Sequence, residues 1–231
     1  MTDDTPTERL NKYLALQLGS SRREADLLIE DGVVTVNGTV ATLGARFTEG
    51  DTIAVHGKVI TAGQDVIYLL FNKPLGYVCS RKKQGDNDTI YALLPLEFHN
   101  LKPVGRLDKD SSGLIMLTND GDFAYQMTHP KFHKVKVYHV RLERELEPLH
   151  QQMISDYGIE LEDGTSKLSL ERLSEDSRKG WQVTMTEGRN RQIRRTFGAL
   201  GYTITKLHRI TFGNYSIGDI KPGEYEIVNM Q

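Results

Sequence analysis

The sequence lacks the residues that cross-link a chain or anchor it in a membrane. It has one cysteine, Cys79, in 231 residues, so it can form neither an internal disulfide nor a multi-thiolate metal site. A lone cysteine also favours a reducing compartment. No apolar run approaches the roughly 20 residues of a membrane helix, and Met1–Thr5 has neither the basic start nor the apolar stretch of a signal peptide. These absences predict a cytoplasmic protein with no membrane partner.

Positive charge is also scarce, because 29 Lys and Arg stand against 31 Asp and Glu, a net charge of −2 that by itself argues against a nucleic-acid partner. The distribution is uneven, however. Segments 131–144 and 187–209 contain one acid each, Glu143 and Glu187. Their basic residues are Lys131, Lys134, Lys136, Arg141, Arg144, Arg189, Arg191, Arg194, Arg195, Lys206 and Arg209. Such patches can bind a phosphate backbone, although an ordinary solvated surface would carry the same charges.

Residues 8–62 have the pattern of a small module that begins with two short helices. Leu10, Tyr13 and Leu14 repeat at helical spacing, and Gly19 ends that helix. Ser21-Arg22-Arg23-Glu24 fits a capping box, in which the serine side chain and the glutamate side chain each hold a free backbone N–H. The sequence therefore predicts two helices that are separated by a tight turn.

A hairpin follows the second helix. Two β-prone runs between Val33 and Val40 flank Asn37-Gly38, which is a strong signal for a two-residue turn. A further strand is expected in segment 50–55. The polar segment 61–65 lacks apolar periodicity and is interpreted as a linker.

Two short helices followed by a hairpin resemble the RNA-binding module named after ribosomal protein S-four, also called the alpha-L motif. In that family the helices present basic residues to structured RNA. The resemblance implies RNA contacts at four positions, which would otherwise be routine surface charges: Arg9, Lys12, Arg22 and Arg23.

Residues 67–231 alternate strand and helix patterns. Buried strands are expected at 66–71, 114–117 and 180–186. Segment 135–142 alternates with a period of two, so one face should be apolar and the other should carry Lys136, Tyr138 or their neighbours.

The loop Gly105–Gly113 contains two aspartates and two serines, and three interpretations compete for it. It could be an ordinary turn, since Asp, Ser and Gly favour turns. It could be a calcium loop, but the twelfth position falls on Asn119 where a bidentate Glu is required. The third interpretation is a catalytic loop.

Four segments, in order, resemble the ribosomal-type RNA pseudouridine synthases, particularly the bacterial enzymes that modify single, mainly large-subunit, ribosomal RNA sites. They are Asn72-Lys73-Pro74-Leu75-Gly76, Gly105-Arg106-Leu107-Asp108 with Ser112-Gly113-Leu114, Lys136-Val137-Tyr138, and Glu187-Gly188-Arg189-Asn190-Arg191-Gln192-Ile193-Arg194-Arg195. The resemblance implies an α+β chain. The module 8–62 would be tethered to a catalytic domain, 67–231, built on a mixed, mainly antiparallel sheet with flanking helices.

The resemblance also implies roles for individual residues. Asp108 would be the catalytic carboxylate, with Arg194 as its cationic partner and Arg195 as the neighbouring alternative. Tyr138 would stack on an extruded uracil, and Arg106 would fill the gap in the RNA or contact a flanking phosphate. Further RNA contacts would come from Lys73, Lys136, Arg189, Arg191 and Arg195. The isomerisation needs no cofactor, which agrees with a sequence that has no dinucleotide fingerprint, P-loop or metal-ligand cluster.

The helix expected after Arg191 should bury Ile193, Phe197 and Leu200 on one side. Its arginines should then lie on the opposite, exposed side, and Gly201 should end it.

Two other functions fit the same residues. The chain could be a non-catalytic RNA-binding ribosome-assembly factor, or a hydrolase that uses Asp108 and Asp110. The sequence does not identify the target uridine or exclude a tRNA. Nothing in it demands an oligomer, so a monomer is expected. Cys79 is expected to be a packed thiol and Trp181 a core residue.

Overall fold

The computed structural model describes residues 7–61, 63, 65–81 and 85–229. The chain forms two compact units. The first extends up to Ile67 and includes Asn119–Gly121, and the second contains residues 68–118 and 122–231. No helix in the described ranges is long and apolar enough to cross a membrane.

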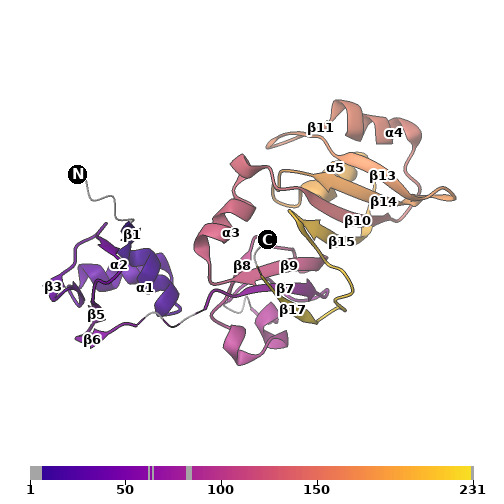
Figure 1. The fold of residues 1–231 in the computed structure, drawn as a ribbon. Coiled ribbons are helices and arrows are strands. Elements are labelled where there is room, and N and C mark those ends of the chain that lie inside the picture. Colours follow the sequence, from indigo (N-terminus) through magenta and orange to yellow (C-terminus); the bar gives the residue numbers. More distant parts are fainter. Residues whose placement is uncertain (1–6, 62, 64, 82–84, 230–231) are drawn as a thin grey trace. The chain divides into compact units, whose positions relative to one another are not determined.

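The first unit packs two helices on a small sheet (Figure 1). Its helices are α1 (Leu10–Gln17) and α2 (Arg22–Glu30). Its strands are β1 (Thr7–Arg9), β2 (Val34–Val36), β3 (Thr39–Val40), β4 (Arg46–Thr48), β5 (Ile53–Val55) and β6 (Lys58–Val59). Strand order is β3-β2-β5-β6, and β1 pairs separately with β4. The core contains Leu10, Leu14, Ala25, Ile29 and Val34.

The local signals of this unit are confirmed. Ser21 accepts a hydrogen bond from the backbone N–H of Glu24 at 3.1 Å, and the Glu24 side chain accepts one from the Ser21 N–H at 2.6 Å. Asn37 and Gly38 have φ values of 51° and 81°, as a type I′ hairpin turn requires.

A nine-stranded sheet forms the second unit, and Figure 1 follows it from β13 at one edge to β17 at the other. The order along the main path is β13 (Ser169–Ser174), β14 (Ser177–Met185), β10 (Lys136–Leu142), β15 (Ile204–Phe212), β9 (Ser112–Thr118), β7 (Tyr68–Lys73) and β17 (Tyr225–Val228). Strand β8 (Lys102–Val104) pairs with β9, and β16 (Tyr215–Ser216) pairs with β15. Only the β9–β15 pairing is parallel in the described sheet. This mixed, mainly antiparallel sheet confirms the α+β prediction.

The remaining elements lie in the connections between the strands. The helices are η1 (Ile90–Leu93), η2 (Leu96–Phe98), α3 (Gly121–Thr128), η3 (Pro130–Phe132), α4 (Pro148–Gln152), the π-helical turn η4 (Met153–Tyr157) and α5 (Gln192–Ala199). A separate hairpin joins β11 (Ile159–Leu161) to β12 (Gly164–Ser166). Helix α3 packs Phe123 and Met127 on the sheet residues Leu70, Met116 and Phe212.

The expected faces of β10 need a correction. Tyr138 is 8% exposed and points to the same side as the buried Val140 and Leu142, whereas Arg141 lies on the other side and is exposed. The face that carries Lys136 and Tyr138 is therefore the mainly apolar one. A tyrosine ring and a lysine stem pack on apolar neighbours, so burial does not follow the simple polar-against-apolar pattern.

Gly113 lets β9 approach β15 closely. It has a φ of +106°, and a Cβ there would lie 2.2 Å from the backbone oxygen of Arg209. Only glycine fits this approach without a shift of one strand. The close pairing fixes the loop before β9 against β15.

Candidate active site

A cleft of about 510 Å³ opens in the second unit. Its walls come from loop 105–108, the end of α3, strand β10, segment 186–191, the start of α5 and strand β15. Asp108, Tyr138 and Arg106 all line it. Predicted residues from two separate segments, 105–108 and 136–138, therefore share one concave surface.

Asp108 meets a guanidinium inside this cleft. Nη1 of Arg191 lies 3.4 Å from Oδ2 of Asp108, and the Asp108 side chain is 37% exposed. The same guanidinium donates two hydrogen bonds to Asp110, at 3.1 and 2.9 Å. These bonds, with the charge of Arg194, lower the pKa of Asp110 below its ordinary value. Arg191 thus connects the two carboxylates of the loop.

The arginine beside Asp108 was predicted wrongly. Arg194 contacts the neighbouring aspartate, with Nη2 donating to the Asp110 backbone oxygen at 2.6 Å and Nε 3.2 Å from its Oδ2. Its Nη1 donates to the Ile204 carbonyl at 3.1 Å. Arg191 precedes α5 in a left-handed conformation with a φ of 46°, which sequence periodicity does not reveal. Arg194 is held one turn further along, against the loop backbone.

Lys73 does not lie on an RNA-facing surface, so the expected RNA contact is wrong. Its residue exposure is 0%, and its ammonium donates to the backbone oxygens of Pro74, Asp108 and Ser111 at 3.0, 3.0 and 2.6 Å. Burial lowers its pKa from the ordinary value. A buried ammonium with three carbonyl partners fixes the backbone of the loop, so Lys73 positions the loop that carries Asp108.

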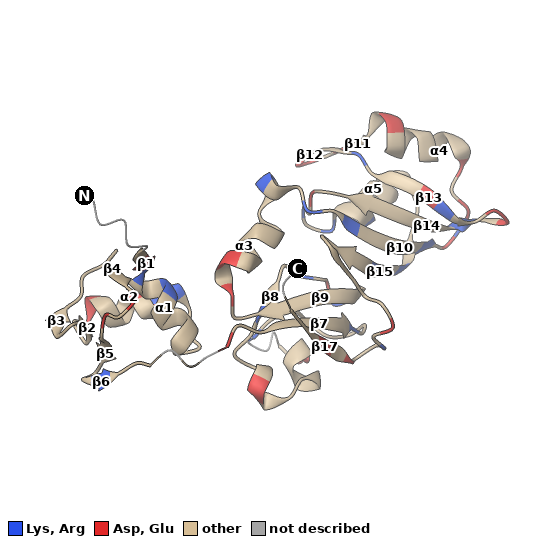
Figure 2. Ribbon diagram, viewed as in Figure 1, with Lys and Arg blue, Asp and Glu red and all other residues tan. Residues whose placement is uncertain are grey.

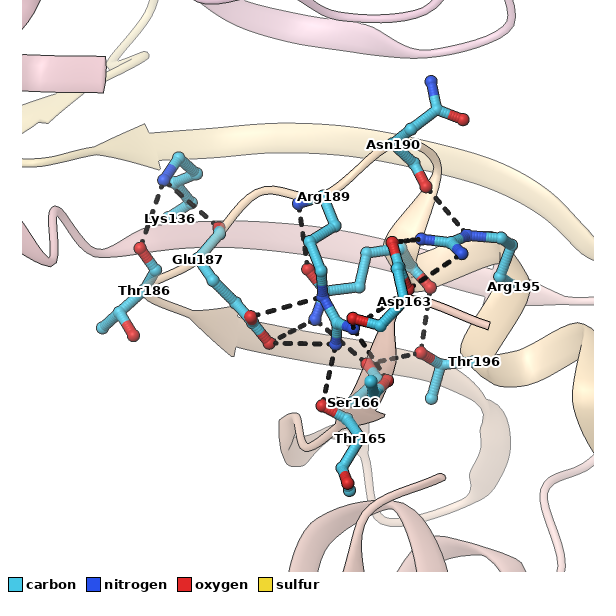
Figure 3. Close-up of polar contacts among 12 residues, drawn as sticks. Lys136, Asp163, Thr165, Ser166, Thr186, Glu187, Arg189, Asn190, Arg195 and Thr196 are labelled. Atoms are coloured by element: carbon cyan, nitrogen blue, oxygen red, sulfur yellow. Dashed lines mark hydrogen bonds and ion pairs between the residues drawn. The ribbon is translucent and has the colours of Figure 1, made fainter. Parts of the chain in front are cut away.

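Arg189 and Arg195 are committed to a contact within the protein (Figure 3). Arg195 makes two bonds to the Asp163 carboxylate, at 3.0 and 2.6 Å, and Arg189 reaches the same carboxylate at 3.0 Å. Arg195 is the main reason why the pKa of Asp163 is lowered. The structure therefore contradicts the expected exposed arginine face of α5, because the hairpin β11–β12 supplies a carboxylate that covers it.

The other predicted cleft residues have distinct surroundings. Lys136 donates to the backbone oxygens of Lys134, Thr186 and Glu187 at 3.3 to 3.4 Å, and burial lowers its pKa. Arg106 is exposed on the rim. Tyr138 lies directly opposite Arg209 in the β10–β15 pairing.

Comparison with known proteins gives this site its family. The chain matches the family described as RNA pseudouridylate synthase over residues 67–199, and the S4 domain over residues 8–53. It is a member of the RNA pseudouridylate synthase family. A crystal structure of a pseudouridylate synthase that is 31% identical superposes with a TM-score of 0.67 and 96% coverage of both chains.

Named relatives of this RNA pseudouridylate synthase come from several bacteria. A ribosomal large subunit pseudouridine synthase B of Bacillus subtilis is 36% identical, covering 94% of this chain and 90% of its own. A ribosomal small subunit pseudouridine synthase A of Pasteurella multocida is also 36% identical, covering 96% and 97%. A dual-specificity RNA pseudouridine synthase of Salmonella typhi is 35% identical, covering 97% and 76%. Its family membership therefore makes this chain an RNA pseudouridine synthase, which is an isomerase.

Sequence reasoning missed several residues in the cleft of this RNA pseudouridylate synthase. Ile193, Leu207, Arg209 and Phe212 also line it. The last three come from β15, where register shifts opposite Val137/Tyr138 and opposite Arg141/Leu142 interrupt the simple alternation of the strand. Leu207 and Arg209 are two residues apart, and this spacing was a usable sequence signal that they share one face of a strand.

The basic residues predicted in the S4 domain lie at the starts of its two helices (Figure 2). Arg9 immediately precedes α1 and is exposed. Arg22 and Arg23 form the first turn of α2 and are exposed. Lys12 forms an ion pair with Glu8 at 3.1 Å. Three of the four predicted positions are thus exposed, and Lys12 shares its charge with an acid.

Proposed function

We propose that this protein isomerises a uridine of large-subunit ribosomal RNA to pseudouridine, with Asp108 as the catalytic carboxylate. The observation that carries the proposal is the position of Asp108 in the cleft, where it lies beside Arg191 and where Arg106 also lines the wall. The names of the relatives from Bacillus subtilis and Salmonella typhi support a ribosomal or related RNA substrate. A substrate of this kind would place the reaction in the cytoplasm.

The proposed reaction requires a cation beside the Asp108 carboxylate. Cleavage of a glycosidic bond leaves the sugar electron-deficient, and an ionised carboxylate stabilises or traps that charge. A base that enters the cleft removes water from Asp108, and loss of hydration favours the neutral acid. Arg191, at 3.4 Å, opposes that effect. We therefore assign Arg191 as the cationic partner of Asp108, in place of the expected Arg194.

The uridine must leave its stack to reach Asp108, which costs a few kcal/mol. Tyr138 lies in the cleft wall and offers a ring on which the base can stack. Arg106 is on the exposed rim, where it can contact the flanking RNA. Lys136 lines the same cleft. This assignment keeps Lys73, Arg189 and Arg195 as structural residues.

The module 8–62 supplies the second part of the proposal. Its exposed arginines at the starts of α1 and α2 can neutralise RNA phosphates, which would dock folded ribosomal RNA while the domain 67–231 acts on it.

A tritium-release assay tests the catalytic proposal. Ribosomal RNA labelled at C5 of uridine loses tritium when the base rejoins the sugar through C5. Wild-type protein should release it, and Asp108→Asn should release none while it binds the RNA with unchanged affinity. A wild-type signal at background would favour the assembly factor, and free uracil in the products would favour the hydrolase. Asp110 is a poor base for such a hydrolase, because two arginines already hold it.

A further inference from the structure

Arg209 lies in the cleft wall and is almost completely buried, with 2% exposure. Its Nε donates to the backbone oxygen of Leu114 at 2.7 Å. Its Nη2 is buried and has no hydrogen-bond partner among the described residues. A buried donor without a partner is costly, and a buried charge without a counter-ion is more so.

Lys136 is a second cation in the same wall. Its ammonium lies 5.4 Å from the centre of the Phe212 ring, and Cζ of Arg209 lies 4.7 Å from the same centre. Both are attracted by the ring, but a ring face does not neutralise a charge. The pKa of Lys136 is lowered first by burial and second by Arg209, against the opposing charge of Glu187.

Neither cation is in an ion pair in the part of the chain that the structure describes. Its acidic neighbours in the cleft have other partners: Asp108 faces Arg191, and Glu187 pairs with Arg189. The wall beside Tyr138 therefore holds two desolvated positive charges whose described contacts are carbonyl oxygens and one ring. Such an arrangement is stabilised when an anion enters the cleft.

We propose that Arg209 and Lys136 form an anion-binding wall that holds a negatively charged oxygen of the nucleotide bound beside Asp108. This inference rests on the proposed function, since it takes a uridine nucleotide as the ligand. One source of the oxygen is a phosphate of the extruded nucleotide. The other is the uracil itself: when the C1′–N1 bond breaks, its electron pair goes to the base and places negative charge on the carbonyl oxygens. Arg209 is the residue whose donor is still unused.

Binding of uridine 5′-monophosphate and of uridine separates the two sources. Full-length wild-type protein, Arg209→Met and Arg209→Lys are titrated with each compound and followed by NMR. Arg178→Met is the matched control, because Arg178 also lies over an aromatic ring, that of Trp181, but does not line the cleft. Single-turnover rates on ribosomal RNA are measured for the same variants.

A phosphate site predicts that wild type binds the monophosphate better than uridine and that Arg209→Met weakens the monophosphate about tenfold, with Arg209→Lys in between. A site for the leaving base predicts equal binding of the two compounds and a single-turnover rate about tenfold lower in Arg209→Met, at unchanged RNA affinity. Arg178→Met should match wild type in both. Arg209→Met that keeps both the affinities and the rate within twofold of wild type overturns the proposal.

Stability distinguishes a ligand-binding arginine from a structural one. Replacing a buried, unneutralised cation with methionine should leave the thermal midpoint of the ligand-free protein unchanged or higher. A lower midpoint that accompanies every loss of binding would instead assign Arg209 to the scaffold and contradict the inference. The nucleotide titrations need no turnover, so a protein that binds through Arg209 but makes no pseudouridine would refute the proposed function alone.

Discussion

At the residue scale, Arg191 and Arg194 contact the two aspartates of loop 105–113 in different ways. Arg191 contacts both Asp108 and Asp110, whereas Arg194 contacts Asp110 and the backbone at Asp110 and Ile204. The first arginine therefore reaches the carboxylate assigned to chemistry, and the second fixes the shape of the loop.

This division predicts different defects for two similar substitutions. Arg191→Met should lower the single-turnover rate about ten- to a hundredfold, because a charge-assisted contact to Asp108 is lost. Arg194→Met should mainly lower the free energy of unfolding, by about 1–3 kcal/mol, because it leaves loop acceptors unpaired. Rates and urea unfolding of both variants check this. A larger rate defect in Arg194→Met at wild-type stability would restore Arg194 as the partner of Asp108.

The low pKa of Asp110 predicts a dependence of stability on acid. Its pKa in the folded protein lies below the ordinary value of 3.8, so its contribution is fully present above that value and is lost as the pH falls through the folded pKa. Urea unfolding between pH 7 and pH 2.5 should show a shallower acid loss in Asp110→Asn than in wild type. Parallel curves for the two proteins would show that Asp110 does not carry this linkage.

Lys73 should behave as a loop support. Lys73→Met removes the cation that three backbone oxygens share, so it should destabilise the fold by about 1–3 kcal/mol and slow turnover. RNA affinity at a temperature where the variant is folded should not change, since the side chain is buried. A loss of affinity without a loss of stability would reinstate the RNA contact that the sequence suggested.

At the element scale, the sequence predicted what is local and missed what depends on distant segments. The capping box at Ser21 and the turn at Asn37-Gly38 use neighbours within four residues, and both formed as expected. The environment of α5 differed from the expectation. Asp163 comes from a hairpin about 30 residues away and pairs with Arg189 and Arg195. Residue types alone do not show which of several arginines a distant carboxylate will meet.

The β9–β15 pairing offers a test at this scale. Gly113→Ala would place a Cβ 2.2 Å from the Arg209 backbone oxygen at a φ of +106°, so it should cost about 3 kcal/mol or more and disturb the cleft. Gly198→Ala in α5 is the matched control, since nothing lies within 4 Å of its Cβ position, and it should be neutral or stabilising by about 1 kcal/mol. Equal unfolding midpoints for the two variants would mean that the close approach of β9 to β15 is unimportant.

At the scale of the whole molecule, the family was predictable from four segments in order, and the relatives cover nearly the full chain. The net charge of −2 gave no sign of an RNA-binding protein, because the basic residues are concentrated in local segments. If the module 8–62 docks RNA, Arg9→Gln with Arg23→Gln should weaken binding of ribosomal RNA. The slope of log affinity against log salt should fall by about 1.4–1.8, while the rate at saturation stays the same. An unchanged slope would remove these residues from the interface.

The central claim is that Asp108 converts one ribosomal uridine to pseudouridine. The most direct measurement is a map of pseudouridines in total RNA from cells that lack this protein and are supplied with either wild type or Asp108→Asn. The account predicts that one large-subunit ribosomal RNA site loses its pseudouridine and regains it only with wild type. A site restored equally by Asp108→Asn, or a map that does not change when the protein is absent, would contradict it.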